Sequence, residues 1–449
     1  MVIDMMVIVG TRPEIIKMSP VIRAIKKDSD LNLVFVHSGQ HYDYEISRLI
    51  IREMELPDPD VNFRIGSGTH AIQTSKMMTD YERIFDEYNP DVVLVEGDTN
   101  TVLAAGLSAV KLHIPLGHIE AGIRSFDKKM PEEINRQIVR ICAELHFAPT
   151  ERAAINLLQE GVLPDKIFIT GNPIVDACLQ NLRIAEAKSR ILERLGLVDA
   201  NPMVTVTVHR PENVDDPRNL KKLVAILLCL RRCEIVFPVH PRTRKKMDEQ
   251  RLTKKLENAE NIHVSGPVGY IDFLRLLSKS ALVLTDSGGI QEEAAILKVP
   301  CLTLRYNTER PETVEMGGNR LVGLDQELVL NYANRILGDP EFKHKLQHLE
   351  NPYGDGRAGE RIVEITKSAC LKGLEVESSR FMRAGSAAYK LVRVDGDLDG
   401  KSIEEICRIR KAHVAIIYDE NGKPRFPYLK TIVQKGWNLL LFGEFCANS

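Results

Sequence analysis

Short apolar runs alternate with helical patterns along the first part of this chain. Runs of strand length lie at residues 6–10, 33–37, 91–97, 114–121, 145–150 and 166–171. The spacing of apolar positions between them predicts helices at 13–27, 69–88, 99–111, 132–143 and 150–160. Continuous apolar strands are typical of buried parallel sheets, and their alternation with helices favours right-handed βαβ units. We therefore expect a doubly wound, Rossmann-like α/β domain.

The same alternation then repeats. Further strands are predicted at 204–209, 234–240, 262–266, 281–286 and 300–305, and further helices at 218–231, 270–278 and 289–297. We place the first domain at residues 1–172 and the second at 173–377, with a last helix that can pack back on the first domain. Two such domains facing each other would bring their strand ends and loops to one interdomain cleft.

The end of the chain has a different pattern. A linker of small residues at 377–388 leads into a module that we place at residues 386–449. It reads as a strand at 389–394, a helix at 402–411, a strand at 413–419 and a final strand at 437–445. An Asn421-Gly422 step between strand patterns indicates a hairpin. The pattern predicts a separate small α/β module.

Composition and charge narrow the class of protein. A chain of 449 residues favours two or three domains, and 44% hydrophobic with 27% charged residues is typical of a soluble protein. A net charge of −2 favours neither nucleic acid nor an anionic membrane as partner. No apolar run approaches the roughly 18–20 residues that span a bilayer, and residues 1–10 read as a strand, not as a signal peptide. A cytoplasmic protein is expected.

The eight cysteines are scattered and form no CxxC pair. Cys229 and Cys233 lie four residues apart, which places them on one face of a predicted helix. We therefore predict neither a structural metal nor a disulfide framework.

Two strand-to-helix turns have the character of anion sites. Gly10-Thr11-Arg12-Pro13 follows a strand, and proline at the first helical position leaves amides and the positive end of the helix dipole for an anion. Arg12 and Lys17 could add charge-assisted bonds to phosphate. The alternative is a surface arginine and lysine at a helix start. The segment has neither the GxGxxG nor the Walker spacing, so NAD and ATP are not indicated.

The second turn is Ser287-Gly288-Gly289, after the strand at 281–286. Glycines let backbone amides approach a phosphate, and Ser287 can bind the anion or cap the helix. Plain turn chemistry is the alternative. Glu293, one turn into the helix, suits ribose hydroxyls better than a phosphate that it would repel.

Four residues at strand ends or helix starts are candidates for acid–base chemistry. Asp98 follows a strand and could be only a helix cap. Glu120 ends an apolar strand, where a charge needs a partner or a purpose. Glu132 opens a helix and could form a solvated ion pair with Arg136 four residues later. His209 ends the first strand of the second domain, where it could also be a buried structural histidine.

Eight segments resemble, in order and at matching intervals, the non-hydrolysing UDP-N-acetylglucosamine 2-epimerases. They are GTRPEIIKMSP, GDTNTVLAA, HIEAGIRS, MPEEINR, GNPIVDA, HRPEN, TDSGGIQEEA and TERPETVE, within residues 1 to about 370. The resemblance implies two Rossmann-like domains in a GT-B arrangement and a homodimer. It also implies interconversion of UDP-N-acetylglucosamine and UDP-N-acetylmannosamine through a 2-acetamidoglucal intermediate, with no cofactor and no metal.

The resemblance assigns roles to individual residues. It makes Asp98, Glu120, Glu132 and His209 the catalytic candidates. The groups that would hold the diphosphate and its surroundings are Arg12, Lys17, Ser287, Gly288, Gly289 and Arg310. Glu293 would bind the ribose, and Phe273 would lie against the uracil.

One segment departs from the family pattern. Many bacterial members carry a QHRxML-type sequence used for activation by the substrate, whereas this chain has Gln40 and His41 followed by Tyr42 in place of the arginine. Weak or altered substrate activation is expected.

The tail resembles a second family. Its DGKSIEEI and TIVQKGW segments and its closing FGE strand are similar to the TrkA-type C-terminal (RCK-C) regulatory domain. Such modules often dimerise and bind small ligands or ions, so a regulatory or dimerising role is expected, with an inert appendage as the alternative.

Other functions stay open at this stage. A GT-B glycosyltransferase would share the nucleotide site but need an acceptor, a hydrolysing relative would release the free sugar, and a nucleotide-sugar sensor would bind without turnover. The row of acidic residues argues against the sensor, because binding a diphosphate does not require it. The GTRPE form favours a sugar without extra substituents, and a surface polysaccharide or glycan precursor is the expected destination of the product.

Overall fold

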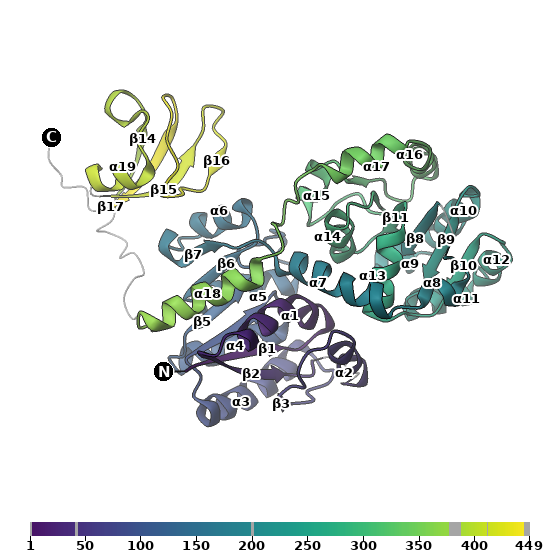
Figure 1. The fold of residues 1–449 in the computed structure, drawn as a ribbon, viewed down its shortest axis with the longest axis horizontal. Helices are drawn as coiled ribbons and strands as arrows, with labels where there is room; N and C mark the ends of the chain where they lie inside the picture. The colour runs from purple at the N-terminus through teal and green to yellow at the C-terminus, as the bar shows by residue number, and fades with distance from the viewer. Residues whose placement is uncertain (1, 41–43, 199–201, 377–387, 411, 444–449) are drawn as a thin grey trace. The chain divides into compact units, whose positions relative to one another are not determined.

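The computed structural model describes residues 2–40, 44–198, 202–376, 388–410 and 412–443 (Figure 1). The chain divides into two compact units. The first combines Met1–Ser47, Asp58–Pro173 and Arg357–Ser449, and the second combines Arg48–Pro57 with Ile174–Gly356. The linker predicted at 377–388 lies, except for its last residue, outside the described residues.

The first unit contains a seven-stranded parallel sheet in the order β3-β2-β1-β4-β5-β6-β7. Its strands are β1 (Ile3–Val9), β2 (Leu31–His37), β3 (Val61–Asn62), β4 (Val92–Glu96), β5 (Leu116–Ile119), β6 (Leu145–Ala148) and β7 (Ile167–Ile169). Its helices are α1 (Arg12–Lys27), α3 (His70–Tyr88), α4 (Asn100–Lys111), α5 (Pro131–Cys142), α6 (Glu151–Gln159) and α18 (Ala358–Leu371), with a 3₁₀ turn at Pro164–Lys166. The strand order is that of a doubly wound sheet, in which loops at the strand carboxyl ends form sites.

Helices cover this sheet because its central strands are apolar on both faces. Residues Met5–Val9 of β1 and all of β4 are buried. Helix α18 packs against α1, where a Cβ on Gly359 would come within 2.8 Å of Pro20 Cβ. The glycine allows this close approach, so the last helix before the tail belongs to the first unit.

The second unit contains a six-stranded parallel sheet in the order β10-β9-β8-β11-β12-β13. Its strands are β8 (Met203–Thr207), β9 (Glu234–Pro238), β10 (Ile262–Ser265), β11 (Leu282–Thr285), β12 (Cys301–Thr303) and β13 (Asn319–Leu321). Its helices begin with α2 (Tyr44–Glu53), most of which belongs to this unit, and α7 (Pro173–Lys188). The others are α8 (Ile191–Leu195), α9 (Pro211–Val214), α10 (Pro217–Cys229), α11 (Pro241–Glu249), α12 (Thr253–Glu257), α13 (Tyr270–Lys279), α14 (Gly288–Ile296), α15 (Pro311–Glu315), α16 (Gln326–Gly338) and α17 (Pro340–Gln347).

The tail folds as a small four-stranded antiparallel sheet in the order β14-β17-β15-β16, with one helix, α19 (Ile403–Arg410). The strands are β14 (Ala388–Arg393), β15 (His413–Tyr418), β16 (Pro424–Arg425) and β17 (Asn438–Gly443), and a 3₁₀ turn lies at Gly396–Leu398. The Asn421-Gly422 turn joins β15 to the short β16, which the pattern did not predict. Asp419 fixes this turn by accepting bonds from the amides of Asn421 and Lys423, both at 3.0 Å. No helix in the described ranges is both long and apolar enough to cross a membrane.

Candidate active site

The turn after β1 is organised by a buried carboxylate that the sequence analysis did not select. Glu14 lies in the first turn of α1, and its Oε2 accepts bonds from the amides of Gly10 at 2.5 Å and Thr11 at 2.8 Å. Its Oε1 accepts a 2.5 Å bond from the Thr99 hydroxyl. Burial raises the pKa of Glu14 to about 7, although these bonds oppose the shift. The amides of Gly10 and Thr11 are therefore engaged by Glu14, and Arg12 lies exposed beside them.

The sequence did carry a signal for Glu14. Thr11 followed three residues later by Glu14 is the spacing of a capping box, and the structure forms that box at the start of α1. The reciprocal bonds fix the turn from which Arg12 and Lys17 extend.

Lys17 joins two carboxylates that end neighbouring strands. Its Nζ lies 3.0 Å from Glu96 Oε1, at the end of β4, and 2.7 Å from Glu120 Oε1, just beyond β5. All three side chains are largely buried, with 13%, 2% and 7% of their surfaces exposed. The structure thus brings together two predicted site residues, Lys17 and Glu120, while the contact of Lys17 with a diphosphate stays a prediction.

Glu120 is held in an unusual backbone conformation. Its φ of +63° lies in the left-handed region, which is uncommon for a residue with a side chain. Asn172 donates a 2.7 Å bond to the same Oε1 that Lys17 contacts. At Gly122, two residues on, φ is +83° and a Cβ would lie 2.1 Å from Ala153 O, so only glycine fits. Strain of this kind collects at functional sites and needs surrounding contacts to hold it.

A buried histidine joins the same two strand ends. His118, on β5, places its Nε2 2.8 Å from the carbonyl of Gly97, which follows Glu96. Burial lowers the pKa of His118 to about 4, so the ring is neutral at pH 7 and donates this bond. It fixes the turn that leads to Asp98.

Asp98 is paired through α5. Arg136 binds the Asp98 carboxylate and also Glu133 Oε2, the latter at 3.0 Å, and Asn135 Nδ2 donates to the Asp98 carbonyl at 2.8 Å. Asp98 is thus more than the simple helix cap considered from sequence. Arg136 reaches Asp98 and Glu133 in place of the expected solvated pair with Glu132.

The sequence analysis selected Glu132, and not the adjacent Glu133, as a candidate for acid–base chemistry. Its side chain is fully buried and accepts 2.9 Å bonds from the amide and hydroxyl of Ser125, whereas Glu132 is half-buried. Burial would raise the pKa of Glu133, but the bonds from Ser125 and Arg136 outweigh it and lower that pKa. Two adjacent glutamates in a first helical turn could not be told apart by sequence, because which of them turns inward depends on the helix's rotation.

In the second unit, a buried aspartate organises the turn that carries His209. Asp286, which follows β11, accepts bonds from the amides of His209 and Arg210 and from Asn213 Nδ2, at 2.9–3.2 Å. His209 Nδ1 lies 3.3 Å from Asp286 Oδ1, and the histidine side chain is 37% exposed. The carboxylate orients the imidazole and leaves part of it open to a ligand. An aspartate directly after a buried strand was the signal for Asp286.

Ser287 occupies the N-cap position of α14 without a capping bond from its side chain, and the two glycines after it are open. A Cβ on Gly288 would meet only Glu309 Oε2, at 3.9 Å, and a Cβ on Gly289 would meet nothing within 4 Å. Packing within this unit therefore does not require glycine here. Open amides at a helix start suit the approach of a phosphate.

Cations and buried carboxylates surround this helix start. Arg310 Nε lies 2.6 Å from Glu292 Oε1, and the Glu292 side chain is only 1% exposed. Arg305 binds Glu309 through two bonds, at 2.9 and 3.0 Å. Burial would raise the pKa of Glu309, but Arg305 lowers it to about 2. Glu293 is also buried, so a ribose contact at this position would need its carboxylate to face the ligand.

Phe273 packs into an apolar cluster with Leu277, Val283 and Val299 and is 8% exposed. Its predicted position against the uracil stays a prediction.

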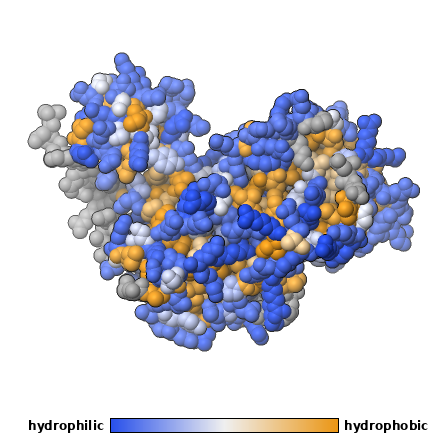
Figure 2. Space-filling model, in the orientation of Figure 1, coloured by the Kyte–Doolittle hydropathy of each residue, from blue (hydrophilic) through white to orange (hydrophobic). Residues whose placement is uncertain are grey.

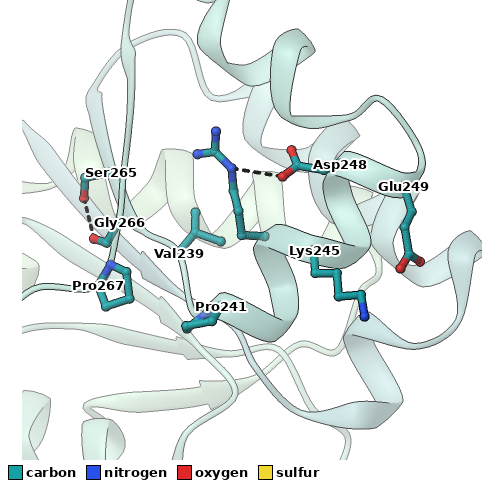
Figure 3. A pocket seen from close by; sticks show the side chains of 9 residues that line it. Val239, Pro241, Lys245, Asp248, Glu249, Ser265, Gly266 and Pro267 are labelled. Carbon is teal, nitrogen blue, oxygen red and sulfur yellow. Dashed lines mark hydrogen bonds and ion pairs between the residues drawn. The ribbon is translucent and has the colours of Figure 1, made fainter. Parts of the chain in front are cut away.

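A cavity of about 670 Å³ lies at the ends of β9 and β10. Figure 3 shows Val239 and Pro241 between the Ser265–Pro267 loop and the charged side chains of α11. The ring of His240, between the lining residues Val239 and Pro241 in the sequence, lies 5.7 Å from the ring of His209.

Gln40 accepts bonds from the amide and hydroxyl of Thr101, at 2.9 and 2.7 Å. His41 and Tyr42, on which the expected change in substrate activation depends, lie outside the described residues. Within the described ranges, no group of three or more histidine, cysteine, aspartate or glutamate side chains is placed to hold a metal ion.

The two parallel sheets with their covering helices are those of a GT-B-type α/β enzyme. A family model described as UDP-N-acetylglucosamine 2-epimerase matches residues 23–367. The chain belongs to this family, and the predicted isomerase class is confirmed. The match ends before the tail module, whose expected relation to RCK-C domains is not established by it.

Individual relatives and solved structures support the same family. The chain is 47% identical over 363 residues to the UDP-N-acetylglucosamine 2-epimerase of Methanocaldococcus jannaschii, covering 80% of this chain and 97% of the relative. The crystal structure of a Methanocaldococcus jannaschii enzyme in complex with UDP-GlcNAc and UDP matches with a TM-score of 0.72 and 46% identity, over 82% of this chain and all of that one. The Neisseria meningitidis enzyme bound to UDP-GlcNAc matches with a TM-score of 0.73, at 34% identity, over 82% and 100% of the two chains. The predicted fold class is confirmed.

Proposed function

We propose that this protein interconverts UDP-N-acetylglucosamine and UDP-N-acetylmannosamine. The observation that carries the proposal is the set of carboxylates at the strand ends of the first unit, in a chain 47% identical to enzymes of that name. Binding a nucleotide sugar does not require buried acids such as Glu120, whereas moving a proton on and off carbon does. The carboxylates therefore favour an epimerase over a nucleotide-sugar sensor.

The proposed mechanism is elimination followed by addition. A base removes the carbon-2 proton, the bond between carbon-1 and the UDP oxygen breaks, and 2-acetamidoglucal and UDP remain bound. UDP then adds back to carbon-1 while carbon-2 receives a proton on its other face. Asp98, Glu120 and Glu132 are the proposed proton-transfer groups, and His209 is the proposed partner of the departing diphosphate.

Most of the residues proposed to bind UDP belong to the second unit. Ser287, Gly288 and Gly289 would present amides to the diphosphate and Arg310 would balance its charge, while Arg12 and Lys17 would act from the first unit. Glu293 would bind the ribose and Phe273 the uracil side. Charge that develops on the leaving UDP would be stabilised by the fixed dipoles and cations around it.

Incubation with UDP-N-acetylglucosamine alone tests this function. The epimerase account expects UDP-N-acetylmannosamine to accumulate to an equilibrium mixture with no acceptor present. Release of free N-acetylmannosamine would instead indicate a hydrolysing enzyme, and inertness until an acceptor is added would indicate a transferase. A Pseudomonas aeruginosa relative, 39% identical, is named UDP-2,3-diacetamido-2,3-dideoxy-D-glucuronate 2-epimerase, so that sugar is the natural competing substrate. We propose the unsubstituted sugar, in a cytoplasmic route to a polysaccharide or glycan.

We also propose that the tail is an RCK-C-like regulatory module that acts through α6. Phe426 packs into a cluster with Ala121, Ala153 and Leu157, and its amide donates a 2.9 Å bond to Glu151 Oε1. Ala121 directly follows Glu120, so the module and the residue after a proposed catalytic group share one apolar cluster. Apolar areas are also visible on the module in Figure 2, and Leu391, Leu429 and Ile432 are more than half exposed. They suit a ligand or a second copy of the chain.

Phe426→Ala is expected to change the rate of epimerisation about threefold to tenfold, because it removes the apolar side chain that joins the module to the cluster of α6 and Ala121. Ile409→Ala, at a 55% exposed position of the same module, is the matched control and should leave the kinetics unchanged. Steady-state rates and light-scattering mass are measured for both variants and for a chain ending at residue 376.

We propose a homodimer, and exposed Ile134 and Ile141, two turns apart on α5, are candidates for its surface. Identical kinetics and mass in all forms would leave the module an inert appendage.

A further inference from the structure

The cluster of Lys17, Glu96 and Glu120 carries more negative than positive charge in a buried place. One ammonium faces two carboxylates, and the three side chains are 13%, 2% and 7% exposed. Taking a charge out of water is unfavourable by several kcal/mol per ion, and its partners must offset that energy. A single proton retained by the two carboxylates would make the cluster neutral.

We propose that Glu96 is a positioning residue for the epimerase reaction, which keeps a proton and donates it in a hydrogen bond to Glu120. In this arrangement Lys17 and Asn172 donate to Glu120 from one side and Glu96 donates from another. Glu120 is thereby kept ionised, oriented and able to accept a proton from the substrate. The inference rests on the proposed function, in which Glu120 is a proton-transfer group.

The backbone places the two carboxylates together. Strands β4 and β5 are parallel neighbours, and Glu96 is paired in register with Ile119, next to Glu120. The left-handed backbone at Glu120 and the bond between His118 and the Gly97 carbonyl fix the two turns that follow these strands. Both carboxylates therefore reach the ammonium of Lys17 from α1.

The electrostatic surroundings agree with this geometry. Burial raises the pKa of Glu96 well above its usual range, Lys17 opposes the shift, and Glu120 and Glu14 add to it. Besides Lys17, Glu14 of α1 acts on Glu96, while Arg124, Asp98 and Glu120 act on the neutral His118 of β5 beside the pair. Glu14 adds negative charge near Glu96 and so favours retention of the proton.

The sign of the pH dependence follows. When the pH falls, the pair takes up a second proton, Glu120 becomes neutral and the rate falls. When the pH rises, the pair loses its shared proton, two buried negative charges oppose each other and the rate falls again. The pair therefore contributes both an acidic and an alkaline limb to the kcat profile.

Two substitutions separate positioning from simple packing. Glu96→Gln keeps an oxygen for Lys17 and an N–H donor for Glu120, so it mimics the protonated acid. We expect kcat within about fivefold of the original and an alkaline limb that disappears or moves to higher pH. Glu96→Met has similar length but no donor, and we expect kcat to fall roughly 100-fold with KM little changed.

A direct readout does not depend on substrate. Infrared spectroscopy at about pH 8.5, where a carboxyl with a pKa of about 7 such as Glu14 is mostly ionised, should show a protonated carboxyl band that Glu96→Gln removes. Absence of the band from the unsubstituted protein, or equal loss of kcat in both variants with unchanged pH limbs, would overturn the proposal. If the protein fails to epimerise at all, the proposed function falls, while the infrared result still decides whether the proton is shared.

Discussion

Replacing Glu120 by glutamine is expected to lower kcat for epimerisation roughly 10³-fold, within the range typical for loss of a positioned acid or base. Glutamine matches the size of the side chain but cannot accept a proton at neutral pH. Its amide would also meet Lys17 and Asn172, which both donate to Glu120 Oε1. UDP affinity should change little, because the groups proposed to bind UDP mostly belong to the second unit.

The control for this substitution is Glu82→Gln, at an exposed position on α3. It removes one carboxylate without touching the cluster and should leave kcat unchanged. Rates and UDP titrations are measured for both variants, with thermal unfolding to confirm folding. A Glu120→Gln enzyme that retains more than about a tenth of the original kcat would show that Glu120 is not a principal proton-transfer group.

Gly289→Val is expected to weaken UDP binding about 100-fold, which corresponds to about 2.7 kcal/mol. The branched side chain would cover the amides at the start of α14 and exclude a diphosphate from them. The second unit itself leaves open space around this position, since an added Cβ meets nothing within 4 Å. The fold should therefore tolerate the change while the ligand does not.

Gly338→Val is the matched control, because Gly338 also lies in a helix, α16, with open space around it. Both substitutions exchange glycine for valine in a helix and should alter the unfolding temperature similarly. Calorimetric titration with UDP then separates binding from folding. Equal UDP affinity in the two variants would remove Gly289 from the diphosphate site.

The elements of the fold could be predicted from periodicity because its strands are short, apolar and regularly separated by helices. The expected helix at 69–88 and the observed α3 at His70–Tyr88 differ by one residue. Strands β3 and β13 were missed, because two or three residues are too few to show a period. The predicted turn at Asn421-Gly422 is present and β15 pairs antiparallel with the predicted final strand, whereas β16 was missed because it has only two residues.

The candidate site was predicted less completely. Glu120 and His209 stood out because charged or polar residues ended apolar strands. Glu96 did not stand out, because its partner Lys17 lies 79 residues away and only the fold brings them together. Asp286 was passed over because the turn that it organises belongs to a different strand. Sequence can thus locate the edge of a sheet where chemistry is expected, whereas the pairing of charges along that edge depends on tertiary structure.

The most direct test of the whole account is epimerisation of UDP-N-acetylglucosamine in deuterated water, followed by NMR of carbon-2. Elimination and re-addition predict one solvent deuterium at carbon-2 of the UDP-N-acetylmannosamine formed, with the glycosyl–UDP link restored. Product that keeps its original hydrogen at carbon-2 would contradict the account, because no carboxylate of this site would then have exchanged that proton.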